Sequence, residues 1–493
     1  MKNKNILNYM LAASIAIGAS ACKKGLDLNP ISQATTTNSF NTADDAEAAI
    51  TGVYNTFSSQ DYYIWDNVYY GDVRSDNHYS GGDNQEFNQL DLLNISPTNS
   101  KVYGDWAALY NAILKANLVL QKVPAITDAK LTATRKNQII GEAAFLRAFN
   151  YYQLVINWGG VPLVLTPIST TDPSETNTAR ASVTQVYDQI VSDLQTAVNN
   201  LPDTYGSDAS VNKARATKGA ANALLAKVWA QRPDRDYNKV LTYCDAVINS
   251  PAGYALVTNY SDLWDAAHYN SSESILEVQF NGTTISNWSP GLLLPPSITN
   301  TTWRKFITPS RDLAKAFDAQ GDVVRKNQSI LFENAPWADE YWSTKVGGSV
   351  PFSYKWRNFV NGNSISRQYL LRLADIILLK AEAQNALGRP AEAATTLNIV
   401  RKRAGLQNTT ATTQADMALA VENERRLELT QEAQRWYDLV RYGRAETVMN
   451  NLVETNLVTG QRVNYNMTKE KELLPIPQTE LNRNPALKQN PGY

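Results

Sequence analysis

Two segments of this 493-residue chain combine flat aromatic side chains with short polar ones. They span residues 60–101 and 281–363, and neither shows helical periodicity. A sugar ring offers an apolar C–H face on which an aromatic ring stacks, and hydroxyl groups that exchange hydrogen bonds with Asn, Asp, Gln or Arg. The two segments therefore favour non-covalent glycan binding. The candidate ligand residues are Tyr62, Tyr63, Trp65, Asp76, Asn77, His78, Trp288, Trp303 and Arg304.

Packing within the two segments is an alternative role for these aromatic residues. The chain holds 25 Tyr, 11 Trp and 11 Phe, more than we expect a core to need. Loops carried by a rigid frame are a usual location for binding sites. Composition alone does not separate ligand contact from packing, so both interpretations stay open for each aromatic candidate.

The sequence lacks the patterns of common catalytic sites. Its only histidines, His78 and His268, lie in separate segments, and no zinc helix, nucleophile elbow or phosphate-binding loop is present. A glycosidase needs two carboxyl groups roughly 5 to 10 Å apart; the 47 acidic residues leave that alternative open without selecting a pair. The acidic turn at 80–86 lacks the ligand spacing of a calcium loop. We predict no enzyme, no cofactor and no required metal.

A dense run of charges over residues 424–444 resembles a carboxylate active site at first sight. On a helix, however, Asp438 lies one turn from both Arg435 and Arg441 and can pair with either. We interpret the run as a helix face that pairs its own charges and fixes neighbouring loops, and we assign it no chemistry.

The first 21 residues have the pattern of a secretory signal that is cleaved off. A basic start is followed by an apolar run over residues 6–17 and by small residues at 19–21. The apolar run falls short of the about 20 residues that a membrane-spanning helix needs. Because Cys22 follows directly, this end resembles the bacterial lipobox, in which the cysteine is lipidated and becomes the first residue. An ordinary signal with an incidental cysteine is the alternative.

The balance of charges argues against a nucleic-acid partner, and the number of cysteines argues against an internal disulfide. The chain carries 46 basic and 47 acidic residues and has a pI of about 6.3, so no basic face for nucleic acid is implied. With Cys22 lipidated, Cys244 is the only remaining thiol, which leaves no internal disulfide. We expect Cys244 to be buried as a small apolar side chain.

The rest of the chain is dominated by helical periodicity. Apolar residues recur at steps of three or four, the spacing of one helix face. Gly159 and Gly160 follow one such stretch and should end it. The predicted helices cover residues 44–59, 106–120, 137–158, 183–201, 218–229, 238–248, 369–387, 390–403 and 417–442.

Two helix pairs carry the small residues that let antiparallel helices stack closely. They are GAANALLAKVWAQRPDRDYNKVLTYCDAV and ADIILLKAEAQNALGRPAEAATTLNIV, and both resemble tetratricopeptide-type hairpins. The chain is therefore predicted to be mainly α: a tetratricopeptide-like helical-repeat scaffold with large irregular loop insertions at the two aromatic segments.

Four segments after the leader resemble the SusD/RagB family, the surface lipoproteins that capture glycans for a TonB-dependent outer-membrane transporter in Bacteroidetes. In chain order they are GEAAFLRAFNYYQLVINWGGVPLVLTP, LLRLADIILLKAEAQNALG with LNIVRKRAGL, NERRLELTQEAQRWYDLVRYG, and the terminal LLPIPQTELNRNPALKQNPGY. The resemblance spans nearly the whole chain.

The resemblance implies a SusD-like architecture, with helices packed against the transporter barrel and the irregular segments forming the ligand face. It divides the chain into a lipoprotein signal at 1–21 and one SusD-like domain at 22–493, whose N-terminal helical part ends near residue 280. It also implies that this protein binds an oligosaccharide or polysaccharide and delivers it to a SusC-like TonB-dependent transporter. A non-catalytic scaffold for transporter assembly or peptide binding is the alternative.

The implied location is the outer membrane, with a lipid anchor and surface exposure. Lys23 and Lys24 follow the cysteine where surface-exported members often carry a more acidic run. This departure bears on surface display and leaves the expected outer-membrane anchoring unchanged.

Overall fold

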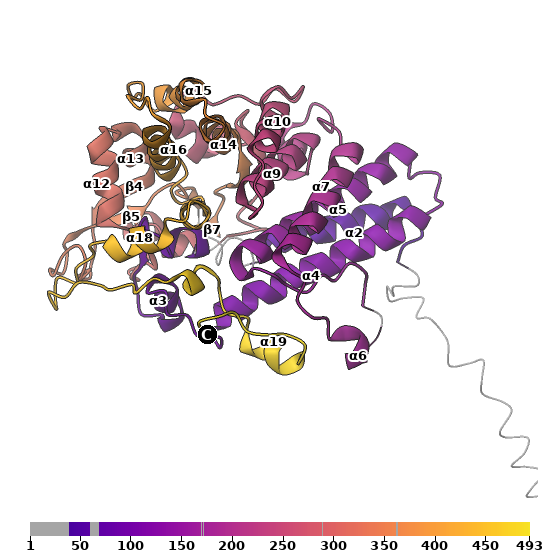
Figure 1. Ribbon diagram of the computed structural model, residues 1–493, viewed down its shortest axis with the longest axis horizontal. Helices are drawn as coiled ribbons and strands as arrows, with labels where there is room; N and C mark the ends of the chain where they lie inside the picture. Colours follow the sequence, from indigo (N-terminus) through magenta and orange to yellow (C-terminus); the bar gives the residue numbers. More distant parts are fainter. Residues whose placement is uncertain (1–38, 60–68, 169, 171, 288, 361–362) are drawn as a thin grey trace, which may run out of the picture.

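Long helices form the N-terminal part of the computed structural model (Figure 1). Helix α2 (Ala43–Tyr54) packs against α4 (Ser100–Lys122) and α5 (Ala133–Trp158), and α5 also packs against α7 (Val183–Asn200). Each begins after a residue whose side chain accepts a hydrogen bond from the first helical turn, which stabilises the helix start. These capping residues are Thr42, Asn99, Thr132 and Ser182.

The structure describes residues 39–59, 69–168, 170, 172–287, 289–360 and 363–493. The predicted signal and Cys22 lie outside these residues, as do the candidates Tyr62, Tyr63, Trp65 and Trp288. In the part of the chain that is described, no helix is both long and apolar enough to cross a membrane.

Two helical hairpins occupy the middle of the chain, as predicted. Helix α9 (Lys218–Gln231) pairs with α10 (Tyr237–Ile248), and α14 (Leu373–Ala386) pairs with α15 (Pro390–Arg403). Helix α10 also packs against α14, so segments far apart in sequence form one continuous stack (Figure 1). This arrangement confirms the mainly α, tetratricopeptide-like scaffold.

Small side chains allow the central helices to be enclosed on all sides. Every residue from Gly219 to Ala230 in α9 is buried, and most of α14 is buried as well. A Cβ atom at Gly219 would lie 2.4 Å from the hydroxyl oxygen of Tyr254, closer than any real packing contact. Cys244 in α10 is fully buried, which confirms the prediction for that thiol.

Several predicted helices differ from the structure. The helix predicted over 44–59 ends at Tyr54, with a 3-10 turn at Asn55–Ser58 after it, and α4 begins at Ser100 instead of residue 106. Residues 368–372 form strand β8 (Gln368–Arg372), so α14 begins only at Leu373. The single helix predicted over 417–442 is divided into α16 (Gln414–Glu428) and α17 (Arg435–Arg441). The turn between them contains Gln431 and Ala433 with φ of 63° and 58°, conformations that a continuing right-handed helix excludes.

The turn between α16 and α17 connects the helical frame to both aromatic segments. Asp72 accepts hydrogen bonds from the N–H groups of Gln431 (3.3 Å) and Ala433 (2.9 Å). Gly71 lies so close that an added Cβ would be 2.4 Å from the backbone of Ala433. From the second segment, the indole N–H of Trp356 donates to the carbonyl of Gln431 (3.2 Å). Contacts distant in sequence therefore hold this turn in its unusual conformation.

Short strands order the two aromatic segments. Antiparallel pairs join β1 (His78–Ser80) to β3 (Ile307–Pro309), β4 (Ile330–Asn334) to β5 (Ser349–Ser353), and β6 (Phe359–Val360) to β7 (Asn363–Ser364). A fourth pair joins β2 (Ser274–Val278) to β8. The other α-helices within the described residues are α3 (Gln85–Asp91), α6 (Pro173–Thr176), α8 (Ala209–Ala214), α11 (Pro296–Thr299), α12 (Arg311–Gln320), α13 (Val323–Ser329), α18 (Ala445–Asn451) and α19 (Gln478–Arg483).

Candidate ligand-binding surface

The first and second aromatic segments meet in space. Strand β1 from the first pairs with β3 from the second, with His78 opposite Pro309 and Ser80 opposite Ile307. The hydroxyl of Ser310 also donates to the carbonyl of Asp76 (2.6 Å). The candidate residues that the structure describes, at 76–78 and at 303–304, therefore belong to one connected region.

Asp76 is enclosed and has two cationic partners. It is 3% exposed, and its carboxylate receives two hydrogen bonds from the guanidinium of Arg435, at 2.7 and 2.8 Å. Arg426 lies 3.1 Å from the same carboxylate. Burial alone would raise the pKa of Asp76, but Arg426 and Arg435 hold it well below its usual range. Asp76 therefore fixes the loop to the helical frame and does not face a ligand on this surface.

Asn77 and His78 are enclosed as well. The side-chain oxygen of Asn77 accepts from Arg426 (2.8 Å), and both residues are at most 1% exposed. Burial lowers the pKa of His78 to about 3, which keeps the imidazole neutral beside Asp72, 3.9 Å away. The expectation that residues 76–78 contact ligand is corrected here, because their polar atoms point into the protein.

Trp303 lies differently, at the surface of the second segment. Its side chain is 63% exposed, the largest exposed fraction of any tryptophan that the structure describes. Arg304 beside it is half-buried, and its Nε atom has no hydrogen-bond partner. An exposed indole next to a guanidinium offers a stacking face and hydrogen-bond donors, the combination that a sugar requires.

Lys305 anchors the loop that carries Trp303. Its side chain is 4% exposed, and Nζ donates to the carbonyl of Gly291 (2.8 Å) and to the hydroxyl of Thr301 (2.9 Å). Burial lowers the pKa of Lys305 to about 8. The amine of Lys305 is thus occupied by hydrogen bonds to neighbouring loop residues, while the indole of Trp303 extends into solvent.

Residues of the first aromatic segment pack against the loop that carries Trp303. The ring of Phe306 packs edge to face on Phe87, with ring centroids 5.5 Å apart. Gly82 has φ of 74°, and a Cβ there would lie 2.3 Å from the ring of Phe306. The N–H of Gly81 donates to the carbonyl of Phe306 (3.2 Å). The position of Trp303 is therefore set by contacts from both segments.

Several aromatic residues of the second segment pack internally. Trp356 is 5% exposed, and Trp342 packs edge to face on Phe332 with centroids 5.3 Å apart. Phe332 itself is 42% exposed, on strand β4.

The charged run is confirmed as a set of ion pairs. Arg441 lies 2.9 Å from Asp438, as expected for one helical turn, and Arg425 pairs with the same carboxylate at 2.8 Å. Arg435 instead reaches Asp76 in the first segment. Further buried pairs join Arg325 to Glu424 (2.7 Å) and Arg372 to Glu428 (2.7 Å). The run thus fixes neighbouring loops as well as its own helices.

One group of side chains in the described residues is spaced to share a metal ion: Asp262, Asp265 and His268, whose ligand atoms lie within 4.8 Å of one another. The group is on the surface, and Nδ1 of His268 is already 2.8 Å from the carboxylate of Asp265. That hydrogen bond raises the pKa of His268. The geometry is that of an ion pair, and we assign the group no metal.

Two family models match the chain in succession. A model described as "Starch-binding associating with outer membrane" matches residues 25–229, and the SusD family model matches residues 303–493. The chain is 27% identical to SusD-like protein P38 of Formosa agariphila and 24% identical to starch-binding protein SusD of Bacteroides thetaiotaomicron, each alignment covering all of both chains. A solved laminarin-binding SusD-like protein is similar at 27% identity with a TM-score of 0.75, covering 92% of this chain and 100% of that one.

The fold, the joined aromatic segments and these likenesses define a class, the SusD-like proteins with a tetratricopeptide-type frame. This chain belongs to the SusD/RagB family.

Proposed function

We propose that this protein is an outer-membrane lipoprotein that binds oligosaccharides non-covalently and delivers them to a SusC-like TonB-dependent transporter. The names of its relatives, which specify starch and laminarin, support the class of ligand. The family description that mentions the outer membrane supports the location. No chemical step is part of the proposal, and the protein acts by binding and release.

The observation that carries the proposal is the exposed indole of Trp303 on an anchored loop. Ordering a loop or side chain on binding costs free energy, about 0.5–1.5 kcal/mol for each side chain that is immobilised. Lys305 and Phe306 already hold the loop in place through their contacts. Binding a ligand therefore requires little further ordering of the loop, and its entropic cost is small. A sugar can stack on Trp303 while its hydroxyl groups accept hydrogen bonds from Arg304.

The lipid anchor is proposed from Cys22 and the preceding small residues. Each buried acyl methylene contributes about 0.8 kcal/mol, and stable anchoring requires more than one chain. We propose that Cys22 begins the mature SusD-like domain of residues 22–493, with residues 1–21 removed. The partner transporter would then meet the protein at the same membrane.

Calorimetric titration of the soluble chain, starting at Lys23, tests ligand binding. The first probes are oligosaccharides from laminarin and from starch, followed by plant, fungal and host-type glycans. Trp303→Ala should weaken binding of the responding glycan at least about tenfold, equivalent to 1.4 kcal/mol. Phe332→Ala, which removes another exposed aromatic ring, is the matched control and should bind normally. Unchanged binding in Trp303→Ala would contradict the proposed site.

A reducing-end assay on the same glycans separates binding from hydrolysis. The proposal predicts no release of reducing ends on prolonged incubation with the purified chain. Release that depends on the protein would contradict the non-catalytic assignment.

A further inference from the structure

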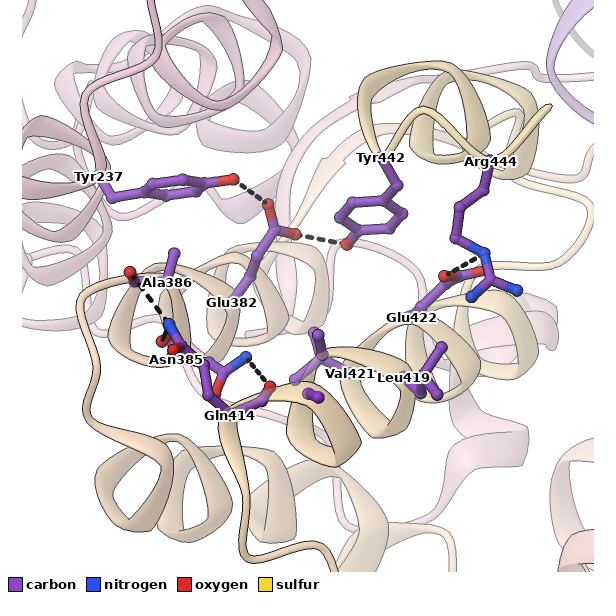
Figure 2. A pocket seen from close by; sticks show the side chains of 12 residues that line it. Tyr237, Glu382, Asn385, Ala386, Gln414, Leu419, Val421, Glu422, Tyr442 and Arg444 are labelled. Atoms are coloured by element: carbon purple, nitrogen blue, oxygen red, sulfur yellow. Dashed lines mark hydrogen bonds and ion pairs between the residues drawn. The ribbon is translucent and has the colours of Figure 1, made fainter. Parts of the chain in front are cut away.

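A cavity of about 610 Å³ lies among helices α10, α14 and α16 and the turn that follows α17. Its lining includes no residue from either aromatic segment, so it is separate from the loop of Trp303. The volume falls within the range of about 300–1,000 Å³ that is typical of small-molecule sites. Figure 2 shows Tyr237 and Tyr442 on either side of Glu382 at one edge of this cavity.

The charged groups of the cavity are neutralised within the protein. Glu382 is bound by the guanidinium of Arg441 (2.6 Å) and accepts a hydrogen bond from the hydroxyl of Tyr442 (2.5 Å). Glu422, at another edge, lies 3.1 Å from Arg435 and 3.2 Å from Arg444. Because each carboxylate already has a cation beside it, the cavity favours an uncharged ligand.

Asn385 supplies an acceptor that the protein leaves without a partner. Its side chain is 5% exposed, and its amide nitrogen donates to the carbonyl of Gln414 (2.9 Å). The side-chain nitrogen of Gln414 donates in return to the carbonyl of Asn385 (2.8 Å), and Figure 2 shows the two side chains together. The side-chain oxygen of Asn385 has no hydrogen-bond partner. That oxygen is closed to solvent, so a ligand reaches it only when the Asn385 side chain rotates toward the cavity; because a buried acceptor without a donor is costly, a ligand that brings a hydrogen-bond donor favours that rotation.

The remaining lining is mostly apolar. Helix α16 contributes Ala415, Ala418 and Leu419, all on its exposed side, and the buried Val421. Leu419 is 51% exposed and lies beside Ala415 and Ala418 on the cavity wall, so the three side chains form one apolar surface. A ligand that covers this surface needs an apolar face next to its hydrogen-bond donors.

We propose that this cavity is a second binding site, for a neutral saccharide. A pyranose ring combines hydroxyl donors on its edge with an apolar C–H face, which meets the requirements of Asn385, the alanine surface of α16 and the tyrosine rings together. The inference takes only its ligand class from the proposed function. The site itself is formed by the helical frame and does not require Trp303.

Methyl NMR of the soluble chain tests this site directly. The probes are neutral trisaccharides prepared from laminarin and from starch, with triglycine as a neutral peptide of similar length. Saccharide should shift the methyl signals of Leu419 and Val421 in the wild-type chain and equally in Trp303→Ala. Ala418→Trp fills the cavity from an exposed helix position and should weaken this response at least about tenfold. Ala391→Trp, on the exposed face of α15, is the matched control and should leave it unchanged.

The possible results distinguish this site from the loop surface. A response that survives Trp303→Ala and is lost in Ala418→Trp supports the second site, even if the loop surface proves inactive. A response that is lost only in Trp303→Ala overturns it, because saccharide would then bind at the loop alone. Absence of any shift at millimolar saccharide, or a shift with triglycine only, overturns the assignment of a saccharide.

Discussion

Replacing Asp76 by alanine should destabilise the protein strongly without removing a ligand contact. The substitution leaves the guanidinium groups of Arg426 and Arg435 buried without the carboxylate between them. Removing one partner of a buried ion pair costs about 3–5 kcal/mol when the remaining charge is left unpaired. Here Arg426 keeps Asp312 (2.7 Å) and Arg435 keeps Glu422 (3.1 Å), so we expect the lower end of that range, about 3 kcal/mol. We expect the free energy of unfolding to fall by about this amount at pH 7. Asp83→Ala, at an exposed position of the same segment, should change it by less than about 0.5 kcal/mol.

The effect of Asp76→Ala should also depend on pH. The folded-state pKa of Asp76 is depressed, so its stabilising contribution is present above its unfolded pKa and is lost as pH falls toward the folded value. The difference between wild type and variant should therefore be largest near neutral pH and should shrink below about pH 4. Urea unfolding followed by circular dichroism, repeated at several pH values, measures this difference.

Two results would refute the reasoning about Asp76. Wild-type stability in Asp76→Ala at pH 7 would show that the buried pair contributes nothing. If Asp76→Ala is folded and stable but no longer binds glycan, Asp76 contacts the ligand, and the interpretation drawn from its burial is wrong.

Three further predictions concern other parts of the chain. Gly71→Ala should cost about 1–3 kcal/mol, because the new methyl group meets the backbone of Ala433, whereas Gly52→Ala in helix α2 has open space and should stabilise by about 0.5–1 kcal/mol; thermal unfolding of the pair measures both. Burial raises the pKa of Glu454 to about 7, so the folded state loses stability as pH rises through that value; Glu454→Gln should remove this loss, and its gain over wild type should grow to roughly 3 kcal/mol between pH 5 and 8. An equal stability difference at the two pH values would contradict that assignment. Cys22→Ala should move the protein from the membrane to the soluble fraction and abolish labelling by fatty acid, and continued labelling would place the lipid elsewhere.

Local patterns predicted the regular helices because their ends carry local signals. Helix α15 (Pro390–Arg403) matches the predicted range at both ends, with Gly388 at φ 78° ending the preceding helix and Pro390 opening the new one. The hairpin pattern of small residues likewise predicted the close packing of α9 and α14. Such signals lie within a few residues of the element they define.

The break between α16 and α17 has no comparable local signal. The segment LTQEAQ has ordinary helix formers, yet Asp72 from a distant segment binds the N–H groups of Gln431 and Ala433. Long-range contacts of this kind override local preference. The same cause explains the wrong expectation for Asp76 and Asn77, whose partner Arg426 is about 350 residues away in the chain. Of the ligand candidates that the structure describes, Trp303 and Arg304 keep the accessibility that contact requires.

The most direct test of the account is a crystal structure of the soluble chain with the oligosaccharide that gives the strongest calorimetric response. The account predicts a sugar ring stacked on the indole of Trp303, with hydroxyl groups within hydrogen-bond distance of Arg304. A ligand bound away from this loop, with the face of Trp303 left uncovered, would contradict the central claim.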